Sequence, residues 1–388
     1  MKLTPLLPLC LLIAACVDDS SVVSGSDHPA EVIDDFKSWR TDGSQELRFD
    51  SDKISATFSQ RIDYSLKDFN FINDRRGYAV GLGAVVGQYP IFYSTDDAGQ
   101  SWTRKPLRIG QNPTGIAFRN AQEGIITTHD TTGCPPPSCL NKTVTLNTQD
   151  GGESWELIEH KELRGSINNP ISDSLGNYYA AVVLLKYDLT LTSHTRSVQL
   201  VKSEDAGRTW DVIYEAGSDA YNAHSFQLVG ETIFVPTDDF TITKLDLSGK
   251  PVGAIETTDG RIQDFIAVSE EVVFALIVLD DTTGYLVRTV DAGQSWDVIR
   301  TDWPWLVAAR SPDAIVVMLY KGRQPGPIDS AGGVSALAYT EDGGLTWAES
   351  EMVQSFYSTI RWNSMSSNRD LILLDDRVVT VVTSPDTR

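Results

Sequence analysis

Short runs of β-branched and aromatic residues alternate with clusters of turn-forming residues along most of the chain. One series consists of the apolar runs 69–71, 78–81 and 91–94, and the same order returns from residue 116. Runs this short favour strands, and helical periodicity is almost absent. The one segment with a helical pattern is 29–39 (PAEVIDDFKSW), in which proline occupies a favoured first position. The pattern predicts an all-β protein with one short helix before it.

An eight-residue pattern, Ser/Thr-x-Asp-x-Gly-x-Ser/Thr-Trp, occurs five times, and the copy at 203–210 reads SEDAGRTW. The aspartate and hydroxyl side chains suit the free amides of a tight turn, and the glycine suits a positive φ. The tryptophan then begins the next strand and packs beside its hairpin partner. Each copy is predicted to close a β-hairpin, with these residues in structural roles: Asp97, Gly99, Trp102, Asp150, Gly152, Trp155, Asp205, Gly207, Trp210, Asp291, Gly293, Trp296, Asp342, Gly344 and Trp347.

The spacing of the copies sets the size of a larger unit. They lie about fifty residues apart, and a degenerate copy at 243–252 (TKLDLSGKPV) divides the one longer gap. Units of this length with four short strands are typical of β-propeller blades. Six units end near residue 353, and the remaining chain supplies three strands of a further blade. A fourth strand from 46–60 would close the ring, so the sequence predicts seven four-stranded antiparallel blades over 46–388, with six as the alternative.

This repeat resembles the Asp-box, or BNR repeat, of sialidases, sortilin-type propellers and photosystem II assembly factors. The resemblance implies a β-propeller in which the box is a structural element. The first unit, 69–102 (FNFINDRRGYAVGLGAVVGQYPIFYSTDDAGQSW), is similar to the assembly-factor and sortilin-like propellers. That similarity implies a non-catalytic platform that binds proteins or peptides, without implying a photosynthetic role.

The sialidase branch of the same superfamily implies an alternative function, an exo-glycoside hydrolase acting on cell-surface glycans. That branch uses a tyrosine nucleophile and several arginines. Tyr357, Arg361 and Arg61 are weak counterparts, but Asp63 stands where the family has proline, and 335–339 (SALAY) lacks the expected arginine. The resemblance covers the repeats and fails at the catalytic positions, so no catalytic residue is assigned.

In a propeller the short repeat turns share one face with the turns between the first and second strands. The connections between the second and third strands lie on the other face, and here they are long and varied. Variable loops on a rigid ring are where binding is expected. The candidate ligand residues on this rim are Tyr187, Arg196, Asp239, Asp281 and Arg323. The acidic pairs 238–239 and 280–281 are interpreted as solvated loops, with a calcium site as the alternative; no cofactor and no resident metal is predicted.

The N-terminus has the features of an export signal. Lys2 precedes an apolar run over 3–15 that is too short to span a bilayer as a helix. The run ends in Ile-Ala-Ala-Cys, which resembles the lipobox of bacterial lipoproteins; this implies a signal peptide at 1–15 and a lipid on Cys16. Val17 favours the outer membrane over the inner one within that family, with the protein facing the periplasm or the cell surface. A polar tether with the short helix is predicted over 16–45.

Cysteine usage and charge complete the prediction. Cys134 and Cys139 in CPPPSC are predicted to form a disulfide that closes a small loop in an oxidising compartment. The formal net charge is −21 at pH 7, and the lysines and arginines are scattered. A nucleic-acid partner is therefore excluded, because an acidic surface gains nothing from phosphate. The predicted partners are a protein, a peptide or a glycan bound at the rim, with a lipid anchor in the membrane.

Overall fold

The computed structural model describes the chain in segments, and nearly all of their regular structure is β-strand. The described residues are 31–32, 56–61, 65–73, 75–82, 90–99, 101–107, 109, 112–130, 142–187, 194–216, 225–257, 260–280, 283–302, 304–309, 311–321, 334–349, 357–362, 371–375 and 378–383. Within these segments no helix is both long and apolar enough to cross a membrane.

Six sheets each contain four strands that follow one another in the chain, and we number them blades 1 to 6; the sheet of blade 1 has a fifth strand, β1 (Glu31–Val32), at its outer edge. Every neighbouring pair within them is antiparallel. Their strands are β3 (Ser65–Phe71), β4 (Gly77–Leu82), β5 (Pro90–Thr95) and β6 (Thr103–Pro106) in blade 1; β7 (Pro113–Phe118), β8 (Gly124–Asp130), β9 (Lys142–Thr148) and β10 (Glu156–Arg164) in blade 2; β11 (Ser166–Ser172), β12 (Tyr178–Tyr187), β13 (His194–Ser203) and β14 (Asp211–Ala216) in blade 3; β15 (Gln227–Val229), β16 (Thr232–Pro236), β17 (Thr241–Asp246) and β18 (Pro251–Glu256) in blade 4; β19 (Arg261–Ala267), β20 (Val273–Asp280), β21 (Thr283–Thr289) and β22 (Asp297–Arg300) in blade 5; and β23 (Pro304–Ala309), β24 (Ile315–Lys321), β25 (Val334–Thr340) and β26 (Ala348–Glu349) in blade 6.

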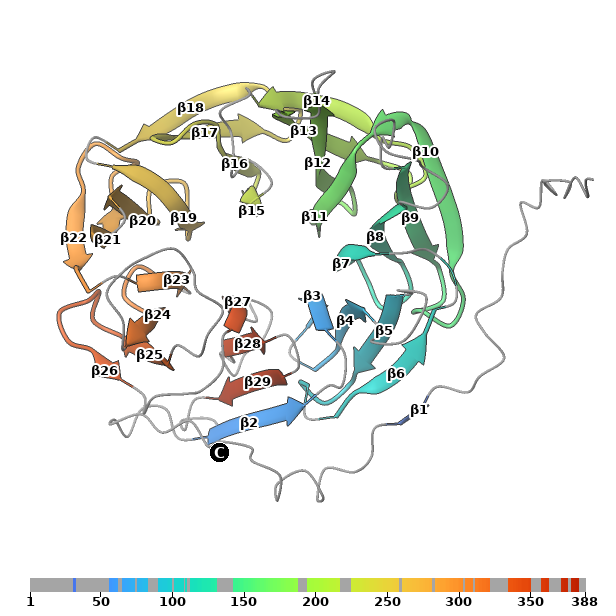
Figure 1. Cartoon of the computed structure of the whole chain (residues 1–388), viewed down its shortest axis with the longest axis horizontal. Helices are drawn as coiled ribbons and strands as arrows, with labels where there is room; N and C mark the ends of the chain where they lie inside the picture. Colours follow the sequence, from blue (N-terminus) through green and yellow to red (C-terminus); the bar gives the residue numbers. More distant parts are fainter. Residues whose placement is uncertain are drawn as a thin grey trace, which may run out of the picture.

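A seventh sheet, which we call the closing sheet, joins early and late parts of the chain in the order β2-β29-β28-β27. β2 (Ala56–Arg61) pairs along its whole length with β29 (Val378–Thr383). β28 (Leu371–Asp375) and β27 (Tyr357–Trp362) complete it. The pairing of the early strand β2 with the late strand β29 thus closes the ring of sheets (Figure 1).

Two sequence-based predictions are corrected here. The sequence predicted seven blades, with six as the alternative, whereas the structure has six blades of consecutive strands. The closing sheet differs from these blades because it joins early and late strands and has no copy of the eight-residue pattern. Its early strand, described over Ala56–Arg61, overlaps the segment 46–60 that was predicted to close the ring. The helix predicted over 29–39 is also wrong at Glu31 and Val32, which are extended because they pair with the outer edge of β6 as strand β1 (Glu31–Val32).

The sheets stand radially around an axis (Figure 1). The first strand of each blade and β27 surround the centre, whereas β6, β10, β14, β18, β22, β26 and β2 lie at the periphery. The inner strand β3 contacts both β7 of blade 2 and β28 of the closing sheet, and β23 of blade 6 contacts β27. The closing sheet is therefore in contact with the first blade on one side and the last blade on the other.

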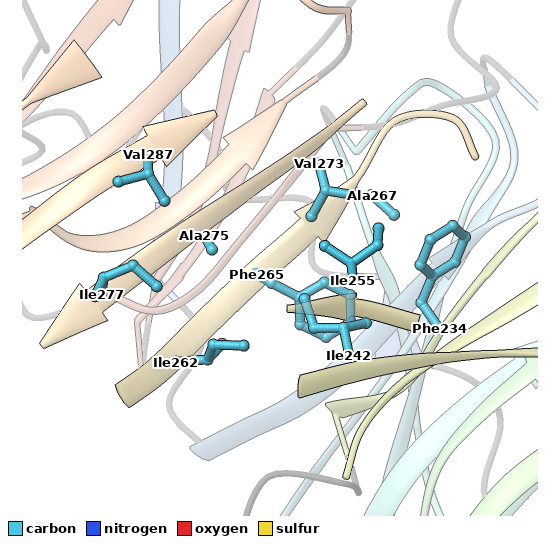
Figure 2. Packing of buried hydrophobic residues seen from close by; sticks show 10 residues of the cluster. All are labelled: Phe234, Ile242, Ile255, Ile262, Phe265, Ala267, Val273, Ala275, Ile277 and Val287. Atoms are coloured by element: carbon cyan, nitrogen blue, oxygen red, sulfur yellow. The ribbon is translucent and has the colours of Figure 1, made fainter. Parts of the chain in front are cut away.

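Neighbouring sheets pack face to face through apolar side chains. Figure 2 shows one such layer, in which Phe234, Ile242 and Ile255 of blade 4 meet Ile262, Phe265 and five further residues of blade 5. Between blades 1 and 2 the layer is aromatic, with the rings of Tyr78 and Phe118 stacked at a centroid distance of 3.6 Å. Each fully buried side chain of this size contributes about 1.5–3 kcal/mol, so the faces between blades are the main source of stability. Alternation along a strand supplies both faces of a sheet, because successive side chains point to opposite sides.

Candidate functional site

The five eight-residue copies each form the same turn between the third and fourth strands of a blade, and we call them repeat turns. In blade 2, Thr148 Oγ1 donates to Asp150 Oδ1 at 2.8 Å, and the backbone N–H of Ser154 donates to the same oxygen at 2.9 Å. Ser154 Oγ donates to Asp150 Oδ2 at 2.5 Å, and the N–H of Gly152 donates to Thr148 Oγ1 at 2.9 Å. Both oxygens of the Asp150 carboxylate thus accept hydrogen bonds within their own turn.

The same hydrogen bonds lower the pKa of the aspartates in blades 2, 3, 5 and 6. The pKa of Asp342 is held well below its ordinary value, chiefly by the hydroxyl and then the backbone N–H of Thr346. Burial acts to raise the pKa of Asp150, but the hydroxyl and N–H of Ser154 outweigh it, and the pKa is lowered. A group held as a fixed, ionised acceptor is poorly suited to donate a proton at neutral pH.

Repeat turns also dock each blade on the one before it. A Cβ built at Gly293 would lie 2.7 Å from a methyl group of Ile255 in blade 4, and Trp296 Nε1 donates to the carbonyl of Glu256 at 3.0 Å. In blade 3, the carbonyl of Ala206 accepts a hydrogen bond from Asn147 Nδ2 of blade 2 at 2.6 Å. The glycine is therefore required for close approach to the neighbouring blade as well as for its positive φ.

The degenerate copy in blade 4 keeps the turn without the tryptophan. Asp246 Oδ1 accepts hydrogen bonds from the N–H groups of Ser248 and Lys250, at 2.9 and 3.0 Å. Gly249 has φ +85° and lies against the backbone of Ile213 in blade 3. The predicted degenerate copy is thus confirmed as the connection between β17 and β18.

The opposite face of the ring carries the predicted ligand rim, and the structure describes it in part. Tyr187 ends β12 opposite His194, and Arg196 pairs with Leu185, so Tyr187 and Arg196 lie at the same end of one hairpin. Asp239 is exposed in the turn between β16 and β17. The remaining predicted residues, Asp281, Arg323, Cys134, Cys139 and Cys16, lie outside the described residues.

The turn 237–240 shows how this rim is held. The carbonyl of Asp239 accepts the N–H of Ile262 at 2.7 Å, and the carbonyl of Phe240 accepts the N–H of Thr257 at 2.9 Å. The backbone of the turn thereby forms hydrogen bonds to both ends of the connection from blade 4 to blade 5. The side chains of Asp238, Asp239 and Phe240 are exposed. Loops between second and third strands therefore meet the connections between blades on one face, as expected from the sequence.

A set of polar side chains on the inner strands was not predicted. Asp68 Oδ2 accepts the N–H of Ile116 at 3.0 Å, and Asn70 Oδ1 accepts the N–H of Phe118 at 2.9 Å, both across the boundary of blades 1 and 2. Gln227 Nε2 of blade 4 donates to the carbonyl of Phe265 in blade 5 at 2.6 Å. These side chains bind backbone groups of the next inner strand that no strand neighbour satisfies. The available signal was a polar residue inside an apolar strand, as in Phe-Asn-Phe at 69–71.

Most inner strands also contain a β-bulge. The register shifts by one residue at Lys67 in β3, at Thr114 in β7, at Gln263 in β19, and between Asn168 and Ile171 in β11. Bulges bend a strand and redirect a side chain. Thr114 Oγ1 uses this redirection to donate to the carbonyl of Ile167 in blade 3, at 2.5 Å. The inner strands near the axis therefore carry a polar lattice that links successive blades.

The weak catalytic candidates lie on opposite edges of the closing sheet. Tyr357 and Arg361 belong to the inner strand β27, and Arg61 ends the outer strand β2. Two strands separate them, which places their backbones about 14 Å apart at the usual strand spacing. The backbone does not bring these three residues together.

No group of three or more His, Cys, Asp or Glu side chains in the described part of the chain is arranged to hold a metal ion. The calcium alternative rested on the acidic pairs 238–239 and 280–281, and Asp281 lies outside the described residues. Calcium binding therefore stays a prediction.

Comparison with known proteins establishes the fold. No protein-family model matches the chain, and no curated protein matches it. Among solved structures, YCF48 bound to D1 peptide superposes with a TM-score of 0.58 at 16% identity, covering 87% of this chain and 99% of that chain. The WD40 β-propeller domain of Doa1 gives 0.50 at 14% identity, covering 85% of this chain and 96% of that one. A GH74 xyloglucanase from Xanthomonas campestris gives 0.50 at 12% identity, covering 83% of this chain and 52% of the enzyme. Identities this low show a shared β-propeller fold.

Proposed function

We propose that the propeller is a non-catalytic scaffold that binds a protein or peptide segment in the cell envelope. The observation that carries the proposal is the superposition, over nearly the whole of both chains, on a propeller solved with a peptide bound. The WD40 propeller of Doa1 belongs to the same fold class. Fold likeness alone does not assign a function, so the proposal also depends on the chemistry of the surface.

Two features of the chain support a binding role over a catalytic one. The carboxylates of the repeat turns accept hydrogen bonds within their own turns, and the polar side chains of the inner strands bind neighbouring backbone. The net charge of −21 gives the surface a long-range attraction for basic partners. We therefore expect the partner segment to be basic.

Binding of short fluorescent peptides to the purified protein tests the proposal. Peptides of equal length that are basic, neutral or acidic are compared by fluorescence anisotropy at low and high salt. The basic peptides are expected to bind at least tenfold more tightly than the acidic ones, and the difference should shrink with salt because screening weakens exposed charge interactions. Absence of binding by every peptide class would refute the scaffold.

A glycoside hydrolase similar to sialidases is the second candidate, supported by the superposition on the xyloglucanase. A panel of fluorogenic sialosides and other glycosides distinguishes it. The scaffold predicts no turnover on any of them. Turnover that disappears in Tyr357→Phe would establish the hydrolase and overturn the scaffold, since Tyr357 is the one nucleophile candidate of that family type.

We further propose that the protein is an outer-membrane lipoprotein anchored through Cys16. Support comes from the apolar run and small residues that precede this cysteine. Metabolic labelling with a fatty-acid analogue should mark the wild-type protein and leave Cys16→Ala unmarked. Equal labelling of both proteins would refute the anchor.

A further inference from the structure

The outer edge of blade 1 is covered by a strand from elsewhere in the chain. β1 pairs antiparallel with β6, so that Glu31 lies opposite Arg104 and Val32 lies opposite Thr103. Blade 1 is therefore a five-stranded sheet, whereas the other blades have four strands. The addition shows that the peripheral edge of a blade in this protein accepts an extended segment.

Corresponding edges of blades 2, 3 and 5 have no such cover among the described residues. β10, β14 and β22 each end their sheet and have one strand neighbour. An end strand presents a row of unpaired N–H and C=O groups, which is a template for another strand. The periphery thus carries further edges of the type that β1 occupies (Figure 1).

The residues equivalent to Arg104 on these edges are aliphatic and exposed. Arg104 pairs with Tyr93, and Tyr93 lies two residues before the repeat turn of blade 1. The same register places Leu157 opposite Leu146, Val212 opposite Val201 and Val298 opposite Val287. Leu157, Val212 and Val298 are 48%, 45% and 57% exposed. Each of these edges therefore offers an uncovered aliphatic side chain at the position where β1 sits on blade 1.

The residue before each aliphatic position is acidic. Glu156, Asp211 and Asp297 stand where blade 1 has Thr103, and an added basic residue would share Glu156 with Arg208 (2.7 Å) and Asp297 with Arg288 (3.6 Å). Directly opposed residues of an added strand contact each other, and opposite charges or paired aliphatic groups stabilise such contacts by about 0.2–1 kcal/mol each. The preferred added strand thus places a basic residue opposite the carboxylate and an aliphatic residue opposite Leu157, Val212 or Val298. The acidic β1 segment does not meet this requirement and fits the edge with Arg104.

We propose that the peripheral strands β10, β14 and β22 bind extended peptide segments of alternating basic and aliphatic residues by adding a strand to each blade. This inference rests on the proposed function and specifies where and how the segment binds. Main-chain hydrogen bonds provide the affinity, and the alternation of the added side chains provides the specificity. The net charge of −21 favours the same basic segments at long range.

The test uses a fluorescent peptide of alternating lysine and valine, with a glutamate–valine peptide as the comparison. One variant combines Leu157→Lys, Val212→Lys and Val298→Lys, because each edge binds independently and all three must be blocked. The control variant combines Leu175→Lys, Val290→Lys and Leu345→Lys, which are exposed aliphatic residues in hairpin turns and not in the outer strands themselves. Both variants remove three exposed aliphatic side chains and add three positive charges.

We expect the peripheral variant to weaken binding of the lysine–valine peptide about tenfold, because the valines of the peptide lose their aliphatic contacts and face charged lysines instead, and the control to change it less than twofold. Hydrogen exchange on the wild-type protein should show new amide protection in β10, β14 and β22, and none in β6, which β1 already covers. Equal weakening by both variants, or new protection in the inner strands or the turn 237–240, would overturn the inference and leave the scaffold intact. No binding of any peptide to the wild-type protein would overturn both.

Discussion

At the scale of single residues, the five tryptophans of the repeat turns share a position and differ in one hydrogen bond. Trp155 and Trp347 donate through Nε1 to the carbonyl of the glycine three residues earlier, both at 3.1 Å. The buried indole nitrogens of Trp102 and Trp210 have no acceptor among the described residues. The tryptophan thus acts mainly as a large apolar group that fills the boundary between blades, and a hydrogen bond from its indole nitrogen is not required at every copy.

This difference predicts unequal effects for two matched substitutions. Trp102 and Trp155 are almost completely buried, so Trp102→Phe and Trp155→Phe remove similar volume. Only Trp155→Phe also removes a hydrogen bond, whereas Trp102→Phe removes an unsatisfied donor. Urea unfolding should show Trp155→Phe to be more destabilising by at least about 1 kcal/mol. Equal losses, or a larger loss for Trp102→Phe, would contradict this assignment.

At the scale of elements, the repeat turns of blades 2, 3, 5 and 6 each connect the hairpin that they close with the preceding blade. Blade 3 shows the arrangement in detail: Trp210 packs edge-on against the ring of His160 in β10, with ring centroids 6.4 Å apart. His160 Nε2 lies 2.9 Å from Thr145 Oγ1, and His160 Nδ1 lies 3.4 Å from Glu162. A histidine that is almost fully buried thus lies in the packing between blades 2 and 3.

The burial of His160 predicts a pH dependence of stability. Removal from water disfavours the imidazolium and lowers the pKa of His160, against the opposing attraction of Glu162 and Asp205. The folded state therefore binds fewer protons than the unfolded state, in which histidine titrates near ~6.5. The stabilisation is complete above that pH and is lost as the pH falls below it, by up to about 1.4 kcal/mol per pH unit.

Urea unfolding of the wild type and of His160→Gln between neutral and mildly acidic pH checks this expectation. Glutamine keeps a polar group beside Thr145 and does not titrate, so the variant should show a shallower decline. Asp291 and Asp342 do not add to the slope in this window, because the hydroxyls of Ser295 and Thr346 lower their pKa in the folded state and unfolded aspartate titrates near ~3.9, below the window. Parallel curves for the two proteins would show that His160 does not carry the pH dependence.

At the scale of the whole molecule, the ring depends on one pairing between distant parts of the chain. β2 and β29 are joined in register, with Ser59 opposite Thr380 and Gln60 opposite Val379. A ring closed in this way has no gap between its first and last sheets, and opening it would expose the facing sides of blade 1 and the closing sheet.

Cysteine substitutions test the register of this closure. Ser59→Cys with Thr380→Cys should form a disulfide under mild oxidation, because the two residues are directly opposed. Gln60→Cys with Thr380→Cys should not, since neighbouring residues on a strand point to opposite faces. Peptide mapping identifies the crosslink, and a raised Tm for the first pair alone is expected, because the bond restrains the unfolded chain. A crosslink in the second pair would show a shifted register.

The sequence by itself determined the turns and therefore the type of fold. A carboxylate, two hydroxyls and a glycine within eight residues satisfy one another locally, as the hydrogen bonds of Asp150 and Gly152 in blade 2 illustrate. The repeat spacing then predicted the radial sheets. Tertiary structure alone decided the contacts between blades, including Asp68 with Ile116 and His160 with Trp210, because each joins residues about fifty positions apart. It also decided that Glu31 and Val32 are extended and not helical, since β-pairing with β6 outweighs the weak local preference for a helix. Interactions between residues close in sequence specify the turns. The edges and faces through which blades contact one another exist only after the ring has formed, so they depend on the tertiary structure.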